Sequence, residues 1–325
     1  MFTRRKTMKS DRPNIKNALP ANLSGITALL TVVIVAAACT FNTGADTSTE
    51  KKNDSDKTTI KKSAISDDDV AGLKKSTATK SSKKSGATSE NADEGDFIPV
   101  YSEITNEKYA ELNQRFEDQK IIENITDSLN ETLSLPTDVN VTFKDCGQVN
   151  AWYQPQTKTI IFCYEFMEFF HEKALEMGKS EEDANQIMIG ATLFFFFHEL
   201  GHCLIDVYDL PATGREEDSV DQLSTYILMD ELDETGQGSA GAGVLMFKAM
   251  SENEEPSAGS FADEHSLSSQ RFYNVACWMY GRDQSEYGFF VEEGILPQAR
   301  AVRCPTEYKK MSSAWQRLTE PWIKK

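Results

Sequence analysis

The chain has few basic side chains: 34 Lys and Arg stand against 51 Asp and Glu, so its net charge is −17. Nucleic-acid phosphates are bound by clustered Lys and Arg, and this deficit argues against a nucleic-acid-binding protein. The charge is uneven, with +5 on residues 1–38, −1 on residues 40–96 and −21 on residues 97–325. We interpret the acidity of the last region as a source of solubility, with a preference for basic substrates as the alternative.

The chain also lacks an apolar run that is long enough to span a membrane, which needs roughly 20 residues. Its two most apolar runs, residues 26–38 and 187–197, are shorter than that. The first run follows a basic start and ends in three alanines before Cys39. It predicts an export signal over residues 1–39, and Ala36–Cys39 resembles a bacterial lipoprotein signal, in which the cysteine is lipidated. Ordinary cleavage before this cysteine and an uncleaved anchor are the alternatives.

Residues 40–96 lack proline and cysteine and contain one aromatic residue, Phe41, while 39 of these 57 residues are Ser, Thr, Lys, Asp or Glu. Such a segment buries too little apolar surface to offset a chain entropy of about 1–2 kcal/mol per residue. We therefore expect a disordered tether, followed by a single folded domain at 97–325. The protein is expected to be extracytoplasmic and membrane-anchored, with secretion as the alternative.

Cysteine is scarce, with six residues in the chain. Disulfides persist in the oxidising compartments that exported proteins reach. The expected disulfides are Cys146–Cys163 and Cys277–Cys304. Besides Cys39, this leaves Cys203 without a partner; it lies in a strongly apolar helix and is interpreted as a buried free thiol.

A hairpin is predicted around the first of these cysteine pairs. Val139–Phe143 alternates between apolar and polar residues, and Thr159–Phe162 is typical of a second strand. Residues 154–157 between them have the composition of a turn.

Histidine is rarer still, with four residues, and two of them stand in the sequence His198-Glu199-Leu200-Gly201-His202. An N-cap pattern at Ser180–Asp183 predicts the start of the helix that carries them. Residues 187–197 are apolar nearly all round, so this helix is expected to run through the centre of the protein. His171, in an amphipathic helix, is interpreted as structural.

Two imidazoles four residues apart lie on one face of a helix, so His198 and His202 can both reach one Zn²⁺ ion. Glu199 then falls beside the metal, where it can take a proton from water and pass it to a leaving amine. The structural alternative is a pair of histidines that are only hydrogen-bonded within a core helix.

A third ligand is required. The longer motif HExxHxxGxxH is excluded, because Ile205 and Tyr208 stand where it has glycine and histidine. In the next helix, Glu217 and Asp221 are four residues apart and share a face. We expect Glu217 to bind zinc and Asp221 to accept the outer N–H of a zinc-bound histidine. Glu216 is the rival ligand, but the residue four positions after it is a valine.

These residues resemble the gluzincin branch of the zinc metallopeptidases. More closely, residues 97–325 resemble a bacterial domain family of unknown function that is described as metallopeptidases. The resemblance implies zinc, a peptide or protein substrate, and a zincin-like α+β fold. In that fold a small mixed or antiparallel sheet packs on a buried active-site helix, and the C-terminal part is mostly helical. The matching segments are Cys146–Gly147, Asn150–Tyr153, Cys163–Glu165, His198–Gln222, Ala262–Ser266, Gln270–Asn274 with Cys277, Tyr280–Gly281, and Leu296–Pro297 with Arg300, Ala301 and Cys304.

Gluzincins commonly use a later His or Tyr to stabilise the oxyanion. His265, oriented by Asp263, is our candidate for this catalytic role, a structural or surface histidine is the alternative, and Tyr273 is a weaker candidate. The Gly-rich residues 236–243 and the acidic residues 252–255 are interpreted as solvated loops that form a mobile rim of the cleft.

An extended peptide can add to an exposed strand beside the metal in this fold type. The strand after Pro136 and the segment Asn150–Tyr153 are candidates for that edge, and a plain hairpin is the alternative. The leading hypothesis is a membrane-tethered extracytoplasmic zinc metallopeptidase. The rivals are a catalytically silent binding or adaptor lipoprotein with a structural zinc, and a zinc hydrolase that does not act on peptides.

Overall fold

The computed structural model describes residues 93–232, 234–252 and 254–324. The predicted export signal and nearly all of the predicted tether lie outside these ranges. The last tether residues are already attached to the domain. The backbone N–H of Leu135 donates to Asp93 Oδ1 at 3.2 Å, and Gly95 N–H donates to Leu135 O at 2.9 Å.

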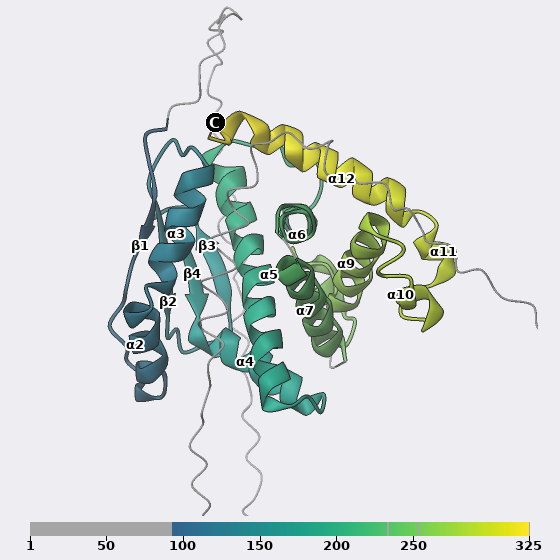
Figure 1. Cartoon of the computed structure of the whole chain (residues 1–325), viewed down its shortest axis with the longest axis horizontal. Coiled ribbons are helices and arrows are strands. Elements are labelled where there is room, and N and C mark those ends of the chain that lie inside the picture. The colour runs from purple at the N-terminus through teal and green to yellow at the C-terminus, as the bar shows by residue number, and fades with distance from the viewer. Residues whose placement is uncertain (1–92, 233, 253, 325) are drawn as a thin grey trace, which may run out of the picture. The chain divides into compact units, whose positions relative to one another are not determined.

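A four-stranded mixed sheet forms one layer of the domain (Figure 1). Its strands are β1 (Phe97–Pro99), β2 (Val139–Lys144), β3 (Ala151–Gln154) and β4 (Thr159–Cys163), in the spatial order β1-β2-β4-β3. β1 and β2 pair in parallel, as do β2 and β4, whereas β3 pairs antiparallel with β4. β3 is therefore an edge strand.

The predicted hairpin is wrong in its first strand. The antiparallel partner of β4 is β3, because only residues 155–158 connect them and so short a link allows only a tight turn. β2 lies between β1 and β4 inside the sheet. The strand after Pro136 therefore cannot serve as a substrate edge, and of the two candidate segments Asn150–Tyr153 remains.

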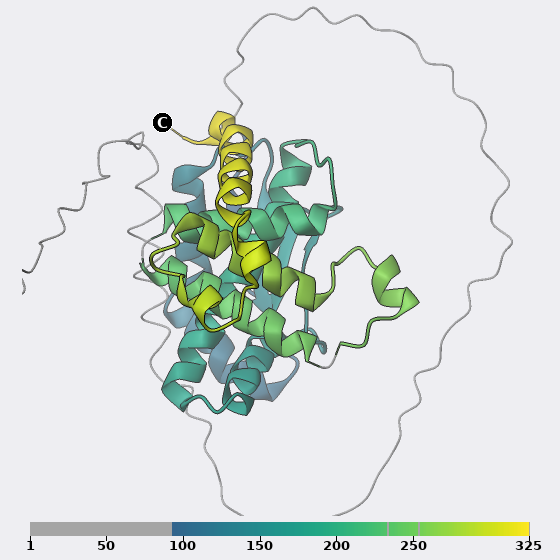
Figure 2. The ribbon, with the colours of Figure 1, turned by 90° about the vertical axis from the view of Figure 1, so that its right-hand side faces the viewer.

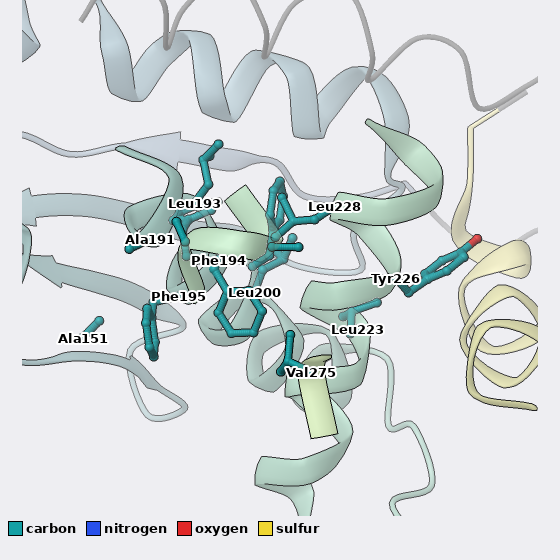
Figure 3. Close-up of a cluster of buried hydrophobic side chains, with 14 of the residues drawn as sticks. Ala151, Ala191, Leu193, Phe194, Phe195, Leu200, Leu223, Tyr226, Leu228 and Val275 are labelled. Carbon is teal, nitrogen blue, oxygen red and sulfur yellow. The ribbon is translucent and has the colours of Figure 1, made fainter. Parts of the chain in front are cut away.

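Helix α5 (Glu181–Val207) is the centre of the domain, in contact with β3, β4 and the helices α4, α6 and α7. Ser180 caps it by accepting the N–H of Asp183 at 3.1 Å. By length and composition α5 passes as a membrane span, but 83% of its apolar window is buried in this domain. Figure 3 shows why it is buried: Phe194, Phe195 and Leu200 of α5 lie in one cluster with Leu223 and Val275 of later helices.

Helices flank the sheet and make up almost all of the C-terminal part (Figures 1 and 2). α3 packs against β1 and β2, and α7 and α9 pack against each other beside α5. The helical segments besides α5 are η2 (Glu107–Tyr109), α2 (Ala110–Asp118), α3 (Ile121–Thr132), α4 (Tyr164–Glu176), α6 (Glu216–Tyr226), the π-helix η3 (Ile227–Glu231), α7 (Glu234–Ser251), α8 (Ala258–Ala262), α9 (Ser268–Arg282), α10 (Phe289–Glu292), α11 (Gln298–Ala301), α12 (Cys304–Thr319) and η4 (Glu320–Trp322).

The interpretation of residues 236–243 as a solvated loop is wrong, because they lie within helix α7. Their small side chains allow α7 to approach α5 closely. A Cβ atom on Gly243 would lie 2.6 Å from the ring of Phe194, and one on Gly190 of α5 would lie 3.0 Å from the Cβ of Ala242. Ala242 and Gly243 therefore serve helix packing, and the segment is not a loop at the rim of a cleft.

Both expected disulfides are present, Cys146–Cys163 and Cys277–Cys304, and Cys203 is a buried free thiol. The first ties the loop before β3 to the end of β4, and the second ties α9 to the start of α12. The predicted fold class is confirmed: the domain is α+β, with a small mixed sheet packed on a buried helix and a mostly helical C-terminal part.

Candidate metal centre

The last turns of α5 place His198 and His202 side by side, with ring centroids 5.0 Å apart. Helix geometry causes this, because residues four apart stack on one face. His198 is buried with 3% of its surface exposed, while His202 lies nearer to solvent.

Helix α6 brings Glu217 against both imidazoles. Its Oε2 lies 3.2 Å from His198 Nε2, and its Oε1 lies 3.2 Å from His202 Nε2. The glycine within the motif makes this approach possible, since a Cβ atom on Gly201 would lie 2.7 Å from the Cβ of Val220 in α6. The structure thus brings together all three ligands that the sequence suggested.

The three donors fit a bound metal ion. Around a tetrahedral ion with bonds of about 2.0–2.1 Å, neighbouring donor atoms are about 3.3 Å apart, close to the 3.2 Å that separates Glu217 from each imidazole. Glu217 Oε2 is buried and accepts no hydrogen bond from any described residue. A cation between the rings would satisfy this oxygen, which is otherwise costly to bury.

Each imidazole of the candidate site has a carboxylate partner at its Nδ1. His198 Nδ1 lies 2.8 Å from Asp221 Oδ1, as the sequence predicted for Asp221. His202 Nδ1 lies 2.7 Å from Glu216 Oε1. Such partners fix the ring so that Nε2 points at the metal. Glu216, considered above as a rival ligand, therefore lies outside the donor set and orients the second histidine.

Arg271 of α9 holds Asp221 in turn, and sequence reasoning assigned it no role. Its Nε and Nη2 each lie 2.7 Å from one oxygen of Asp221, and its guanidinium covers the ring of Phe247 at 4.3 Å. A two-pronged contact of this kind fixes a carboxylate in position and direction. Arg271 lies in Gln270–Asn274, one of the segments that carry the family resemblance, so the sequence did mark it. Its partner Asp221 is 50 residues away in the chain, so no local pattern links the two.

The charges of this cluster shift its pKa values. Burial lowers the pKa of His198, but its hydrogen bond to Asp221 and the nearby carboxylate of Glu217 outweigh burial and raise the pKa to about 9. Burial raises the pKa of Asp221, but the charge of Arg271 outweighs it and lowers the pKa to about 2. The pKa of Glu217 is likewise held below its usual range by the two imidazoles, against the effect of burial. The carboxylates are therefore ionised at neutral pH, as a cation site requires.

Glu199 is buried beside the centre and bound to the edge of the sheet. Its Oε2 accepts the backbone N–H of Tyr153 in β3 at 2.8 Å. The Tyr153 hydroxyl and Lys158 Nζ each lie 2.6 Å from Asp206, in the last turn of α5. These contacts hold the β3–β4 hairpin against α5 next to Glu199.

His265 reaches the same centre from the segment after α8. This part of the chain projects from the neighbouring helices (Figure 2). Its Nε2 lies 3.1 Å from Glu217 Oε2, and its Nδ1 lies 3.0 Å from Asp263 Oδ1, so Asp263 is placed to orient it. Tyr273 is exposed on α9 and stacks edge-on against Phe272. His171 is buried in α4 and faces Glu181 at the start of α5, at the opposite end from the metal centre.

Comparisons with known proteins agree with this geometry at the level of the family. The domain family described as "Putative metallopeptidase" matches residues 101–319, a range that contains every residue of the centre. No curated protein and no solved structure matches the chain. Since the matched range covers more than half of the sequence and holds the His-His-Glu group that could bind a metal ion, the chain belongs to this metallopeptidase family.

Proposed function

We propose that the protein is a zinc-dependent peptidase of the gluzincin type, with zinc held by His198, His202 and Glu217. Two nitrogens and one carboxylate are the donor set that catalytic zinc sites use, with one position left open. When bound, zinc supplies the Lewis acidity that polarises a carbonyl and activates water at neutral pH. The family membership supports peptide or protein substrates.

The chain's own groups divide the remaining work. Glu199 takes the proton of the attacking water and later delivers it to the leaving amine. Asp221 and Glu216 keep the two imidazoles oriented, with Arg271 holding Asp221. His265, whose side chain is 47% exposed, donates its Nε2–H to the oxyanion, and Asp263 fixes its ring.

The substrate is proposed to lie extended along β3. This strand is an edge of the sheet, and its Tyr153 N–H binds the catalytic carboxylate directly. A peptide that adds to such an edge would present its backbone next to Glu199. This contact between edge strand and Glu199 is the observation that carries the proposal, because a purely structural zinc needs neither a buried base nor a neighbouring peptide edge.

The substitution Glu199→Gln tests the assignment. It keeps the shape of the side chain but removes the base, so we expect cleavage of an unstructured peptide mixture to fall at least a hundredfold while zinc is retained. Glu182→Gln, in the exposed first turn of the same helix, is the matched control and should cleave normally. A Glu199→Gln protein that cleaves as well as the control would refute the role. Bound zinc without any cleavage by the unsubstituted protein would favour the binding-protein alternative.

We further propose that the domain is exported and tethered through a lipidated Cys39. The basic start, the apolar run and the three alanines before Cys39 support this, as do the two disulfides, which are typical of oxidising compartments. Labelled palmitate should enter the full chain and be lost in Cys39→Ala, whereas Cys203→Ala should keep the label. Label that persists in Cys39→Ala, or never enters, would count against the tether.

A further inference from the structure

Three imidazoles converge on Glu217, and the proposed metal centre uses two of them. His265 Nε2 lies 3.1 Å from Glu217 Oε2, and His198 Nε2 lies 3.2 Å from the same oxygen. His202 Nε2 lies 3.2 Å from Oε1. The three rings share a second feature, since each has its Nδ1 within 3.0 Å of a carboxylate, as is usual for metal-binding histidines. These carboxylates belong to Asp221, Glu216 and Asp263.

We propose that Glu217 is a bridging ligand, and that Glu217, Glu264 and His265 form a second, weaker zinc site beside the first. The donor atoms of these three side chains all lie within 4.8 Å of one another. Glu217 is 7% exposed, and its Oε2, which faces His265, accepts no hydrogen bond from any described residue. One imidazole with two carboxylates suits zinc, and a shared carboxylate is a common link between paired metal ions.

The grouping of the donors argues against one ion that binds all of them. His198 and His202 group with Glu217, and His265 groups with Glu217 and Glu264, so Glu217 is the common member. All donors of a single ion must lie close to one another, and His265 does not fall in the group that holds His198 and His202. His265 is therefore better placed to hold a second ion than to complete the coordination of the first.

The second site should be the weaker one. The side chain of His265 is 47% exposed and Glu264 is exposed as well, so water competes for both. The shared carboxylate also places two cations close together, and their repulsion opposes the second binding step. Ser266 Oγ donates to Asp218 Oδ1 of α6 at 2.9 Å. This hydrogen bond holds the segment that carries Glu264 and His265 against α6.

Occupancy of the second site has a consequence for cleavage that rests on the proposed function. The second ion would take the Nε2 of His265, which is then unable to donate to the oxyanion. It would also hold residues 263–266 beside the first site. Zinc beyond the first equivalent is therefore expected to inhibit peptide cleavage.

Zinc stoichiometry tests the site without relying on activity. The purified full chain is stripped of metal and dialysed against buffers of increasing free Zn²⁺, and bound zinc is measured by elemental analysis. We expect two binding steps, the second at least tenfold weaker. His265→Ala and Glu264→Gln should lose the second step and keep the first, and Glu264→Gln, an exposed change, guards against a folding defect. Glu255→Gln, an exposed acid before α8, should keep both steps.

Three results would overturn the second site. The full chain could bind one equivalent that neither substitution affects, or one equivalent whose affinity falls in His265→Ala, which would make His265 a ligand of the first ion. It could also bind two equivalents that both substitutions leave intact. A chain that binds no zinc at all would refute the proposed function too, so the two failures are distinguishable.

Discussion

Asp221 is the residue on which the orientation of His198 depends, and it is 2% exposed. It joins a metal-facing imidazole to a buried arginine, with contacts of 2.8 Å to His198 and 2.7 Å to Arg271. Glu216 Oε1 lies 2.7 Å from His202 Nδ1 in the same way, but its side chain is 46% exposed and no arginine among the described residues forms a salt bridge with it. The two carboxylates that contact the histidines therefore differ in burial: Asp221 is enclosed and Glu216 is half exposed.

This difference predicts unequal effects of removing each charge. Asp221→Asn should weaken zinc binding by about 10–100-fold, as is typical when the outer partner of a ligating histidine is lost. It should also lower the free energy of unfolding by about 3–5 kcal/mol, because Arg271 is left buried without a counter-charge. Competition with a chelator and denaturant unfolding measure the two effects. Glu216→Gln should change both quantities less, and equal losses in the two variants would contradict the assignment.

The sequence predicted the candidate ligands and missed Arg271 for one physical reason. His198, Glu199 and His202 lie within about one turn of a helix, so helix periodicity alone places them together. The partner of Arg271 is 50 residues distant in the chain, and such a contact is set by how α9 packs on α6. No local pattern encodes that packing.

The spacing of α5 and α7 depends on small residues at the helix contact. A Cβ atom on Gly243 would lie 2.6 Å from the ring of Phe194, whereas one on Gly238 in the same helix meets no atom within 4 Å. The same composition misled the sequence interpretation, because glycine signals loops as well as close helix packing. Only the partner surface, here Phe194, distinguishes the two meanings.

The two glycines give a matched pair of substitutions. Gly243→Ala should lower the free energy of unfolding by about 1–3 kcal/mol, since the added methyl forces α7 from α5. Gly238→Ala should raise it by about 0.5–1 kcal/mol, because alanine is the better helix former and the space is open. Thermal or denaturant unfolding measures both. Opposite signs are expected, and a stabilising Gly243→Ala would show that the helices are not in close contact there.

The hairpin illustrates a second limit of sequence reasoning. The strand pattern of residues 139–143 and 159–162 was sound, and both segments are strands, but their pairing is parallel. Alternation of side chains shows which residues are buried and not which strand lies next to which. The four-residue connection 155–158 fixed the true partner of β4, namely β3.

At the scale of the whole molecule, the domain combines a four-stranded sheet packed on helix α5 with two disulfides. Cys146–Cys163 secures the loop before β3, the strand whose N–H binds Glu199, and Cys277–Cys304 joins the last helices. The sequence predicted the central helix from its apolar run and N-cap, and it predicted both disulfide pairs, whereas the α+β class followed from the family resemblance. The order of the strands and the packing of α7 depend on contacts across the chain.

The central claim is zinc-dependent peptide hydrolysis at the His198-His202-Glu217 centre. Its most direct test is a zinc titration of the metal-stripped full chain, with cleavage of an unstructured peptide mixture as the readout. The account predicts no cleavage without zinc and a rate that rises in proportion to added zinc up to one equivalent. A rate that is independent of zinc, or no cleavage at one bound equivalent, would contradict it.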